Sequence, residues 1–316
     1  MTPPKNPAKN PAKQDKASTE IRVDVEGRTL RLSNLGKVLY PLTGTTKGEV
    51  LNYYARIAPV LLPHLKDRAV TRVRWPHGTH ESSFFEKNAP AGTPSWVRTA
   101  RVPTTGSRGE SRHGDTLVFP VVDDLATLTW MVNLAALELH VHQWTVGKNG
   151  QPKNPNRLVI DLDPGEPAGL HECAQVALLV RDKLGERDLA ATAVTSGSKG
   201  IHLYAALPGK LNPDETSALA KEIAEELQKE HAKLVTATMT KSRRTGKVFL
   251  DWSQNAGSKT TLTPYSLRGR DKPTVATPLS WAEVEAGAED PLDIEQFRYE
   301  AVLERVDDLG DLFAAP

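Results

Sequence analysis

Cysteine is nearly absent from this chain of 316 residues, which contains only Cys173. A single cysteine excludes an internal disulfide and a zinc site built from cysteines. Cys173, Val176, Ala177 and Val180 form an apolar pattern with helical spacing, so we expect Cys173 to lie in the core. Long apolar runs are also missing, because none reaches membrane-spanning length and no apolar signal region follows the basic start. We therefore expect a soluble, cytoplasmic protein with no membrane partner.

A charge imbalance is missing as well, since 40 Lys and Arg against 39 Asp and Glu give a formal net charge of +1. The distribution is uneven. Residues 1–18 contain four lysines and one aspartate among repeated Pro, Ala and Asn, which predicts a disordered basic tail. The chain as a whole is 39% hydrophobic, and residues 19–316 are expected to form its folded part. They can bury the core of one large domain or of two tightly joined halves.

Two aspartates stand at the end of an apolar run. Asp161 and Asp163 follow residues 158–160, and Pro164 ends the run. Because side chains alternate along a strand, the two carboxylates would share one face. Neighbouring carboxylates beside a core repel each other unless a cation lies between them, so the pattern suits a hard divalent metal. Two solvated acids at a strand end remain the simpler alternative.

A glycine-rich turn at residues 196–200 precedes a strand-like segment at residues 201–204. The two glycines allow the backbone to approach a ligand, and Ser196 and Lys199 add donors that suit phosphate oxygens. His202 lies in the alternating segment that follows. Taken alone, each feature has a simpler interpretation: residues 196–200 would be an ordinary hairpin turn, and His202 would be a core histidine.

A third segment, VFLDWSQN, again ends an apolar strand in a carboxylate, Asp251. Cations precede and follow it, and these are Lys241, Arg243, Arg244, Lys247 and Arg268. Three acids from two strand ends, with converging cations, suit a metal–triphosphate complex. The three aspartates would hold the metals, and Lys199, Arg244 and Arg268 would neutralise the phosphates. In such sites two ions about 4 Å apart activate the attacking oxygen and stabilise the leaving one.

In this order the segments DLDPG, SGSKGIHLY and LDWSQN resemble the three catalytic motifs of the archaeo-eukaryotic primase superfamily. The strongest similarity is to the polymerase domain of bacterial DNA ligase D. It extends from about residue 21 to about residue 311 and includes LSNLGKVLYP, SFFEKN, PSW and LELH. The resemblance implies an α/β (α+β) primase-polymerase fold, with an RRM-like catalytic sheet and a smaller helix-rich half flanking the active-site cleft. No ligase or nuclease segment is recognised, so we expect a stand-alone relative.

The resemblance implies a role for each matching residue. Asp161, Asp163 and Asp251 would hold two Mn²⁺ or Mg²⁺ ions. The nucleotide would be bound by Ser196, Lys199, His202, Arg244, Arg268 and His140. The 5′-phosphate of gapped or broken DNA would be bound by Asn34, Lys37 and Lys47, and lysines suit the extra charge of a phosphate monoester. Template bases would stack on Phe84 and Phe85, which is worth about 1–3 kcal/mol per base.

Some of these residues have simpler interpretations. Asn34 could be the N-cap of a helix over residues 35–40, and the two lysines could be solvated surface charges. If Phe84 and Phe85 lie in a strand, one must face inward, so we expect only one to stack fully. His142 would share the face of His140 and is an alternative to it.

The remaining pattern describes the layout. Helical spacing predicts amphipathic helices over residues 47–65, 127–139 and 214–232. Hairpin-like connections favour α/β layers around an antiparallel or mixed sheet rather than a doubly wound parallel one. Residues 96–115 are rich in Gly, Ser and Thr and are interpreted as a DNA-facing loop. Its arginines are Arg98, Arg101, Arg108 and Arg112. The lysine-rich tail either adds salt-sensitive DNA affinity or is inert.

The predicted function is that of a template-directed DNA repair polymerase, in which a primer 3′-hydroxyl attacks the α-phosphate of an NTP or dNTP. The resemblance implies manganese, a preference for ribonucleotides, and work near the nucleoid at short gaps or double-strand-break ends with a 5′-phosphate. It further implies an end-binding protein and a separate DNA ligase as partners. Two alternatives come from other classes. One is a phosphohydrolase with Asp161 as nucleophile and Asp163 as acid/base, which Pro164 and the hairpin-like strand oppose; the other is a non-catalytic module that binds DNA ends.

Overall fold

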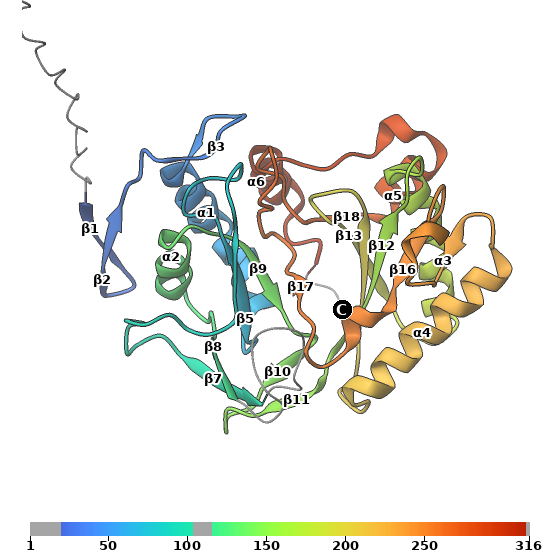
Figure 1. The fold of residues 1–316 in the computed structure, drawn as a ribbon, viewed down its shortest axis with the longest axis horizontal. Coiled ribbons are helices and arrows are strands. Elements are labelled where there is room, and N and C mark those ends of the chain that lie inside the picture. Colours follow the sequence, from blue (N-terminus) through green and yellow to red (C-terminus); the bar gives the residue numbers. More distant parts are fainter. Residues whose placement is uncertain (1–19, 104–115, 314–316) are drawn as a thin grey trace, which may run out of the picture.

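The structure, a computed structural model, describes residues 20–103 and 116–313 and consists of two halves that lie side by side, each with its own sheet (Figure 1). The predicted tail at residues 1–18, together with Arg108 and Arg112, lies outside the described residues. Within the described ranges, no helix is both long enough and apolar enough to cross a membrane.

The first half is built on a four-stranded sheet with the strand order β17-β9-β5-β6. Its strands are β5 (Val70–Arg74), β6 (Phe84–Glu86), β9 (Ala136–Val141) and β17 (Thr261–Leu262). Three helices share a core with this sheet, and they are α1 (Lys47–Leu65), α2 (Leu125–Asn133) and α6 (Tyr299–Leu309). The half that was expected to be helix-rich therefore also contains a sheet of its own.

Paired strands extend this half. They are β1 (Glu20–Val25) with β2 (Arg28–Ser33), β3 (Val38–Tyr40) with β4 (Thr45–Thr46), β7 (Thr99–Pro103) with β8 (Thr116–Pro120), and β10 (Trp144–Val146) with β11 (Pro152–Pro155). Buried side chains of β7, β8 and β10 form a small separate core.

The second half is a six-stranded sheet with the order β15-β16-β12-β14-β13-β18. Its strands are β12 (Arg157–Pro164), β13 (Ala191–Thr195), β14 (Ile201–Ala206), β15 (Val235–Thr236), β16 (Val248–Asp251) and β18 (Thr277–Leu279). Every pairing is antiparallel except β15 with β16, which confirms the predicted mixed sheet. Its helices are α3 (Leu170–Gly185), α4 (Pro213–Glu230) and α5 (Trp281–Glu289), and its 3-10 turns are η1 (Lys241–Arg243), η2 (Trp252–Asn255) and η3 (Pro291–Asp293).

The alternation along β12 decides where its carboxylates point. Leu158, Ile160 and Leu162 belong to the core that contains α3, α4 and α5, whereas Val159 belongs to the core of the first half. The opposite face of β12, which carries the two aspartates, is therefore turned toward the first half. Cys173 on α3 is fully buried in the helix-side core, as predicted.

Two of the three predicted helices are confirmed and one is wrong in its extent. Helix α1 spans residues 47–65 as predicted, and its capping box joins Thr46 and Glu49. Helix α4 spans residues 213–230 and begins after the N-cap Asn212. The helix expected over residues 127–139 ends at Asn133 instead, and strand β9 follows.

The error at residues 134–139 has a tertiary cause. Ala135 adopts φ +61, which is not helical, and the next residues pair with β5 from Ala136 to Val141, with one register shift at Leu137. An apolar run of this length is compatible with the period of a helix and with that of a strand. Pairing in the sheet therefore decides between them and overrides local propensity.

The helix N-cap interpretation of Asn34 is also wrong. Asn34 adopts φ +56 in a turn in which the Lys37 amide donates to the Asn34 carbonyl at 2.9 Å. The chain then enters strand β3, because residues 38–40 pair with β4 rather than coil into a helix.

Candidate active site

Three polar residues stand in register across neighbouring strands of the second sheet. Asp161 on β12 lies opposite Asp251 on β16 and opposite His202 on β14. Residues in cross-strand register present their side chains on the same face. The His202 Nε2 lies 3.3 Å from the Asp161 Oδ1, and Asp163 lies two residues farther along β12. The structure therefore brings together the three predicted aspartates and His202.

The electrostatics of this row are unfavourable without a counter-charge. Burial, followed by the charges of Asp163 and Asp251, raises the pKa of Asp161 well above its usual value. Burial and the charge of Asp251 likewise raise the pKa of Asp163. Nearby cations oppose the shift at Asp163, and these are Arg244 and Arg268. A bound cation would relieve the repulsion that remains.

Asp251 is held by its own local structure. Its Oδ1 accepts from the Ser253 amide at 3.0 Å and the Ser253 hydroxyl at 2.6 Å, and its Oδ2 accepts from Gln254 at 3.0 Å. Among the described residues, no three or more His, Cys, Asp or Glu side chains are arranged as they stand to enclose a metal ion. The donor chemistry nevertheless fits a hard divalent ion, because all three groups offer carboxylate oxygens and two of them have raised pKa values.

The glycine-rich turn packs directly against β12. The Ser196 hydroxyl oxygen accepts from the Ser198 amide at 3.2 Å and the Gly200 amide at 3.1 Å, which leaves its own proton free to donate. A Cβ atom added to Gly200 would lie 1.9 Å from the Leu162 carbonyl oxygen. The close approach of turn and strand therefore requires glycine at position 200 and sets the turn beside the carboxylates.

Gly200→Ala is expected to lower the free energy of unfolding by about 2–3 kcal/mol, because a backbone carbonyl must move to admit the methyl group. Urea unfolding followed by circular dichroism measures this change. Gly185→Ala is the matched control, since no atom lies within 4 Å of its added Cβ at the end of α3, and alanine there is expected to be neutral or stabilising. Equal stability of the two variants would contradict the packing argument.

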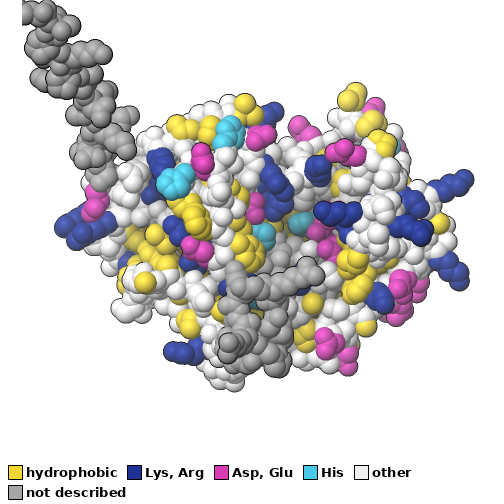
Figure 2. Space-filling view, in the orientation of Figure 1, with side chains coloured by type: hydrophobic (Ala, Val, Ile, Leu, Met, Phe, Trp, Pro, Cys, Tyr) yellow, Lys and Arg dark blue, Asp and Glu magenta, His cyan; other side chains and the backbone are white. Residues whose placement is uncertain are grey.

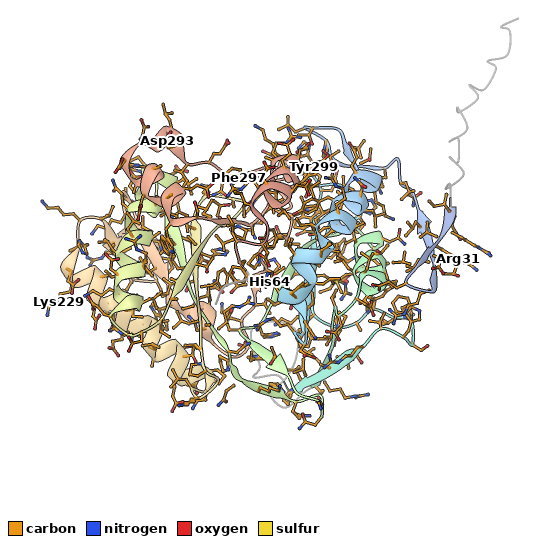
Figure 3. The ribbon with its side chains drawn as sticks, turned by 180° about the vertical axis from the view of Figure 1, so that it is seen from behind. Arg31, His64, Lys229, Asp293, Phe297 and Tyr299 are labelled. Carbon is orange, nitrogen blue, oxygen red and sulfur yellow. The ribbon has the colours of Figure 1, made fainter. Side chains whose placement is uncertain are left out.

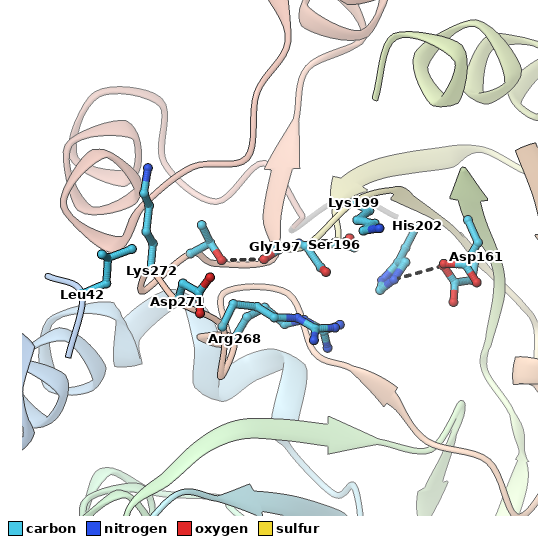
Figure 4. Close-up of a pocket in the computed structure, with 13 residues that line it drawn as sticks. Leu42, Asp161, Ser196, Gly197, Lys199, His202, Arg268, Asp271 and Lys272 are labelled. Atoms are coloured by element: carbon cyan, nitrogen blue, oxygen red, sulfur yellow. Dashed lines mark hydrogen bonds and ion pairs between the residues drawn. The ribbon is translucent and has the colours of Figure 1, made fainter. Parts of the chain in front are cut away.

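The row of carboxylates opens into a cavity of about 560 Å³, and its hollow is visible between the halves in Figure 2. In Figure 4, His202 points toward Asp161 and the Arg268 side chain extends toward both. The lining residues are Leu42, Asp161, Asp163, Ser196, Gly197, Ser198, Lys199, His202, Arg268, Arg270, Asp271, Lys272 and Thr274. Sequence reasoning assigned no role to Arg270 or Lys272, although the basic run RGRDK that contains them was a usable signal.

The predicted phosphate-binding cations differ in their surroundings. Lys199 lines the cavity, and its exposed amine forms an ion pair with Glu166 at 3.3 Å. Arg268 lines the cavity, and its buried Nε has no hydrogen-bond partner in the structure as described. Arg244 does not line the cavity; it donates to the Met239 carbonyl at 2.8 Å and stacks 3.5 Å over the Phe249 ring.

Glu138 belongs to the segment LELH but was assigned no role from the sequence, and it organises one wall of the site. Its carboxylate accepts from His140 Nε2 at 2.8 Å, from Arg268 Nη1 at 3.4 Å and from the Gly269 amide at 3.0 Å. Although burial alone would raise the pKa of Glu138, the hydrogen bond and charge of His140 and the charge of Arg268 lower it to about 2. His140 is therefore placed beside Arg268, while its alternative, His142, is buried and stacked on Trp144.

His202 is a neutral imidazole at neutral pH. Burial, and then the charges of Arg268 and His140, lower its pKa to about 3. Its Nδ1 lies 3.3 Å from the Tyr204 hydroxyl, which in turn donates to the Leu262 carbonyl. Because the Tyr204 proton goes to Leu262, the one N–H of the neutral ring lies on Nδ1, and Nε2 is an acceptor that faces Asp161. The raised pKa of Asp161 favours its protonated form, which can donate to this nitrogen.

The three residues predicted to bind a 5′-phosphate lie together at the start of α1. Asn34 and Lys37 are exposed, whereas Lys47 is only 5% exposed and its Nζ donates to the Ser33 carbonyl at 2.7 Å. The interpretation of Lys47 as a solvated surface charge is wrong, because the first turn of α1 packs against the turn that follows β2. Burial, and then the charge of Lys37, lower the pKa of Lys47 to about 8.

Phe84 and Phe85 are exposed to similar extents, 50% and 48%. The expectation that one of them faces inward is wrong, because β6 is the edge strand of its sheet and both of its faces reach solvent. Phe85 also contacts the His140 ring edge-on at a centroid distance of 6.4 Å.

The loop predicted to face DNA is partly a strand. Residues 99–103 form β7, on which Arg101 is exposed. Arg98 instead forms ion pairs with Asp67 at 2.5 Å and Asp123 at 2.7 Å, so its position is fixed by neighbouring carboxylates.

Comparison with known proteins gives a consistent result. Residues 46–313 match the family model described as LigD, primase-polymerase domain. Over 286 residues the chain is 46% identical to the multifunctional non-homologous end joining protein LigD of Mycolicibacterium smegmatis, covering 90% of this chain and 36% of that protein. It is 33% identical to the bifunctional LigD of Bacillus subtilis, covering 89% of this chain and 43% of that protein. The chain thus spans less than half the length of these curated relatives.

A solved structure is similar along nearly the same length. It is the polymerase domain from Mycobacterium tuberculosis Ligase D in complex with DNA, with a TM-score of 0.82 and 44% identity. The match covers 90% of this chain and 98% of that one. The mixed α/β fold predicted from the sequence is thereby confirmed.

Proposed function

Because the chain belongs to the family of LigD primase-polymerase domains, we propose that it is a template-directed nucleotidyltransferase that extends DNA primers at short gaps or broken ends. The observation that carries this proposal is the cross-strand row of Asp251, Asp161 and His202, of which Asp161 and His202 line the cavity beside the glycine-rich turn.

The protein's own groups supply most of the chemistry. The Ser196 hydroxyl, oriented by the Ser198 and Gly200 amides, suits a phosphate oxygen of a nucleoside triphosphate, and Lys199 and Arg268 balance the charge. Glu138 holds Arg268 and His140 in place before the nucleotide arrives. Asp161, Asp163 and Asp251 would hold divalent ions, which when bound lower the pKa of the primer hydroxyl and stabilise the departing pyrophosphate.

Several finer features belong to the same proposal. We infer manganese as the preferred ion, ribonucleotides as preferred substrates, and a role in non-homologous end joining with an end-binding protein and a separate ligase. Phe84 and Phe85 offer two exposed rings for template bases, and Asn34, Lys37 and Lys47 form the 5′-phosphate pocket. The phosphohydrolase alternative is disfavoured, because β12 is antiparallel to both of its neighbours rather than part of a parallel sheet.

The test is extension of a labelled primer across a short gap with a 5′-phosphate, with ribo- or deoxynucleotides and Mn²⁺ or Mg²⁺. Template-matched addition that is stronger with ribonucleotides and Mn²⁺ is expected. Intact binding to the gap without any addition would favour a non-catalytic DNA-end binding module instead. Release of phosphate from a simple aryl phosphate would favour the phosphohydrolase.

Preference for a 5′-phosphorylated gap is expected to fall as pH rises from 7 to 9. The lowered pKa of Lys47, about 8, means that this amine loses its proton within that range, and a neutral amine no longer attracts phosphate. Extension rates on phosphorylated and hydroxyl-ended gaps, compared at each pH, measure the preference. Lys47→Arg is the control, since a guanidinium stays charged and its preference should not change with pH. A parallel decline in both proteins would assign the effect to another group.

A further inference from the structure

A second, smaller cavity lies at the junction between the two halves. Its volume is about 120 Å³, and its lining includes His64, Arg68, Asn156, Arg157, Tyr204 and Phe313. It shares no lining residue with the carboxylate cavity. Arg68 precedes β5 of the first sheet and Arg157 begins β12 of the second, so the cavity is bounded by both halves. His64 on α1 is labelled at this junction in Figure 3.

Two guanidinium groups line this cavity, and no carboxylate is among the described residues that line it. Within residues 20–103 and 116–313, the acceptors of Arg68 are neutral: the His142 carbonyl at 3.0 Å, the Trp144 carbonyl at 3.2 Å and the Asn156 side chain at 2.8 Å. Burial and the charge of Arg157 lower the pKa of Arg68 well below its usual value. The two cations therefore repel each other in a buried place.

Of the two arginines, Arg157 has fewer hydrogen-bond partners to offset the burial of its charge. Its Nη1 is buried and has no hydrogen-bond partner in the part of the chain that the structure describes. Its Cζ lies 5.5 Å from the centroid of the Tyr204 ring and 5.1 Å from that of Phe313. Ring faces attract a cation weakly, and they do not satisfy its N–H donors. Burial lowers the pKa of Arg157 to about 10.

The carboxylate nearest in sequence to Phe313 already accepts hydrogen bonds from other groups. Asp311 accepts from His64 Nε2 and from the Tyr265 hydroxyl, both at 2.7 Å, and from the Phe313 amide at 2.9 Å. It therefore has its own partners beside the cavity. Buried guanidinium groups are normally paired with an anion, so the missing partner at this junction is an anionic group.

We propose that this cavity binds a small oxyanion of the phosphate type between Arg68 and Arg157, and that the anion joins the two halves of the protein. The cavity is well below the size of sites for nucleotide-sized ligands, about 300–1,000 Å³, which excludes a nucleoside triphosphate. Guanidinium groups match the geometry of phosphate oxygens. The phosphate is either free in solution or a backbone phosphate of a DNA strand, since both present the same oxygens.

Thermal unfolding of the full chain in inorganic phosphate, compared with chloride at equal ionic strength, tests the proposal. At a concentration about ten times the dissociation constant, the anion should raise the Tm of the unmodified protein by about 2 °C in a saturable way. Arg157→Met should lose this increment, because the thioether keeps the packing between the rings and removes the charge. Arg157→Lys should retain part of it and serves as the second variant if the methionine variant folds poorly.

Two controls separate this site from other effects of phosphate. Arg181→Met removes an arginine that is likewise stacked on a ring, 4.9 Å over Trp281, but lies outside the cavity, so it reports the general stabilisation by phosphate. Arg268→Gln weakens anion binding in the carboxylate cavity and should leave the increment unchanged. A short single-stranded oligonucleotide serves as the second probe. If it raises the Tm of the unmodified protein but not that of Arg157→Met, and inorganic phosphate raises neither, the source is a DNA phosphate. An equal increment in Arg157→Met and the unmodified protein, or no increment with either probe, would overturn the proposal.

Discussion

Replacing both Asp161 and Asp163 with asparagine is expected to abolish primer extension, with a loss of about 1000-fold or more. The two amides keep the shape of the carboxylates but remove the negative charge that a divalent ion requires. Binding to gapped DNA should change by less than about threefold, because the pocket at Lys37 and the rings of β6 lie outside the cavity. Gel-based extension and fluorescence anisotropy measure the two properties in the same buffer.

The control and the stability of this variant sharpen the test. Asp307→Asn with Asp308→Asn removes the same charge from the exposed side of α6 and should leave extension unchanged. In metal-free buffer the active-site variant should be more stable than the unmodified protein, because it relieves the repulsion among Asp161, Asp163 and Asp251. Added Mn²⁺ should then stabilise the unmodified protein and not the variant. Substantial extension by the variant would remove these aspartates from the mechanism.

The local pattern was sufficient to predict the arrangement of the site along each strand. The pairing of β14 with β12, which places His202 beside Asp161, spans α3 and β13 and was not predicted from the local pattern. Alternation did place Asp161 and Asp163 on one face, and the glycine-rich turn does join β13 to β14 in a hairpin. Those relations depend only on the period of a strand and on short loops, which sequence specifies well. The predicted α1 was correct for a similar reason, because its capping box and apolar stripe lie within one continuous segment.

Relations between distant segments could not be predicted in this way. Glu138 meets Arg268 and Gly269 across more than a hundred residues, and the segment that carries it was assigned to a helix. Its pairing with β5 decides the outcome, and no local signal encodes that pairing. Burial of Lys47 against Ser33, and the exposure of both Phe84 and Phe85 on an edge strand, are likewise properties of the assembled halves.

Alanine at both Lys37 and Lys47 is expected to remove the preference for gaps that carry a 5′-phosphate, a loss of about 10- to 100-fold in discrimination. Lys47 is buried and held by the Ser33 carbonyl, so its charge is fixed near the exposed Lys37 rather than free to seek solvent. Burial, and then the charge of Lys37, lower the pKa of Lys47, and two cations held this close together suit an anionic partner. Rates on phosphorylated and hydroxyl-ended gaps give the discrimination directly.

The matched control for this pair is Lys221→Ala with Lys229→Ala, which removes two exposed lysines from α4 in the other half. That variant should discriminate as the unmodified protein does, because loss of general positive charge weakens all DNA binding equally and is sensitive to salt. A specific pocket predicts a different pattern: Lys37→Ala with Lys47→Ala should slow extension only on phosphorylated gaps and leave hydroxyl-ended gaps unaffected. If the unmodified protein extends both gaps at the same rate, the two lysines have another purpose. In that event, the packing of α1 against the Ser33 turn is the role that the contacts of Lys47 support.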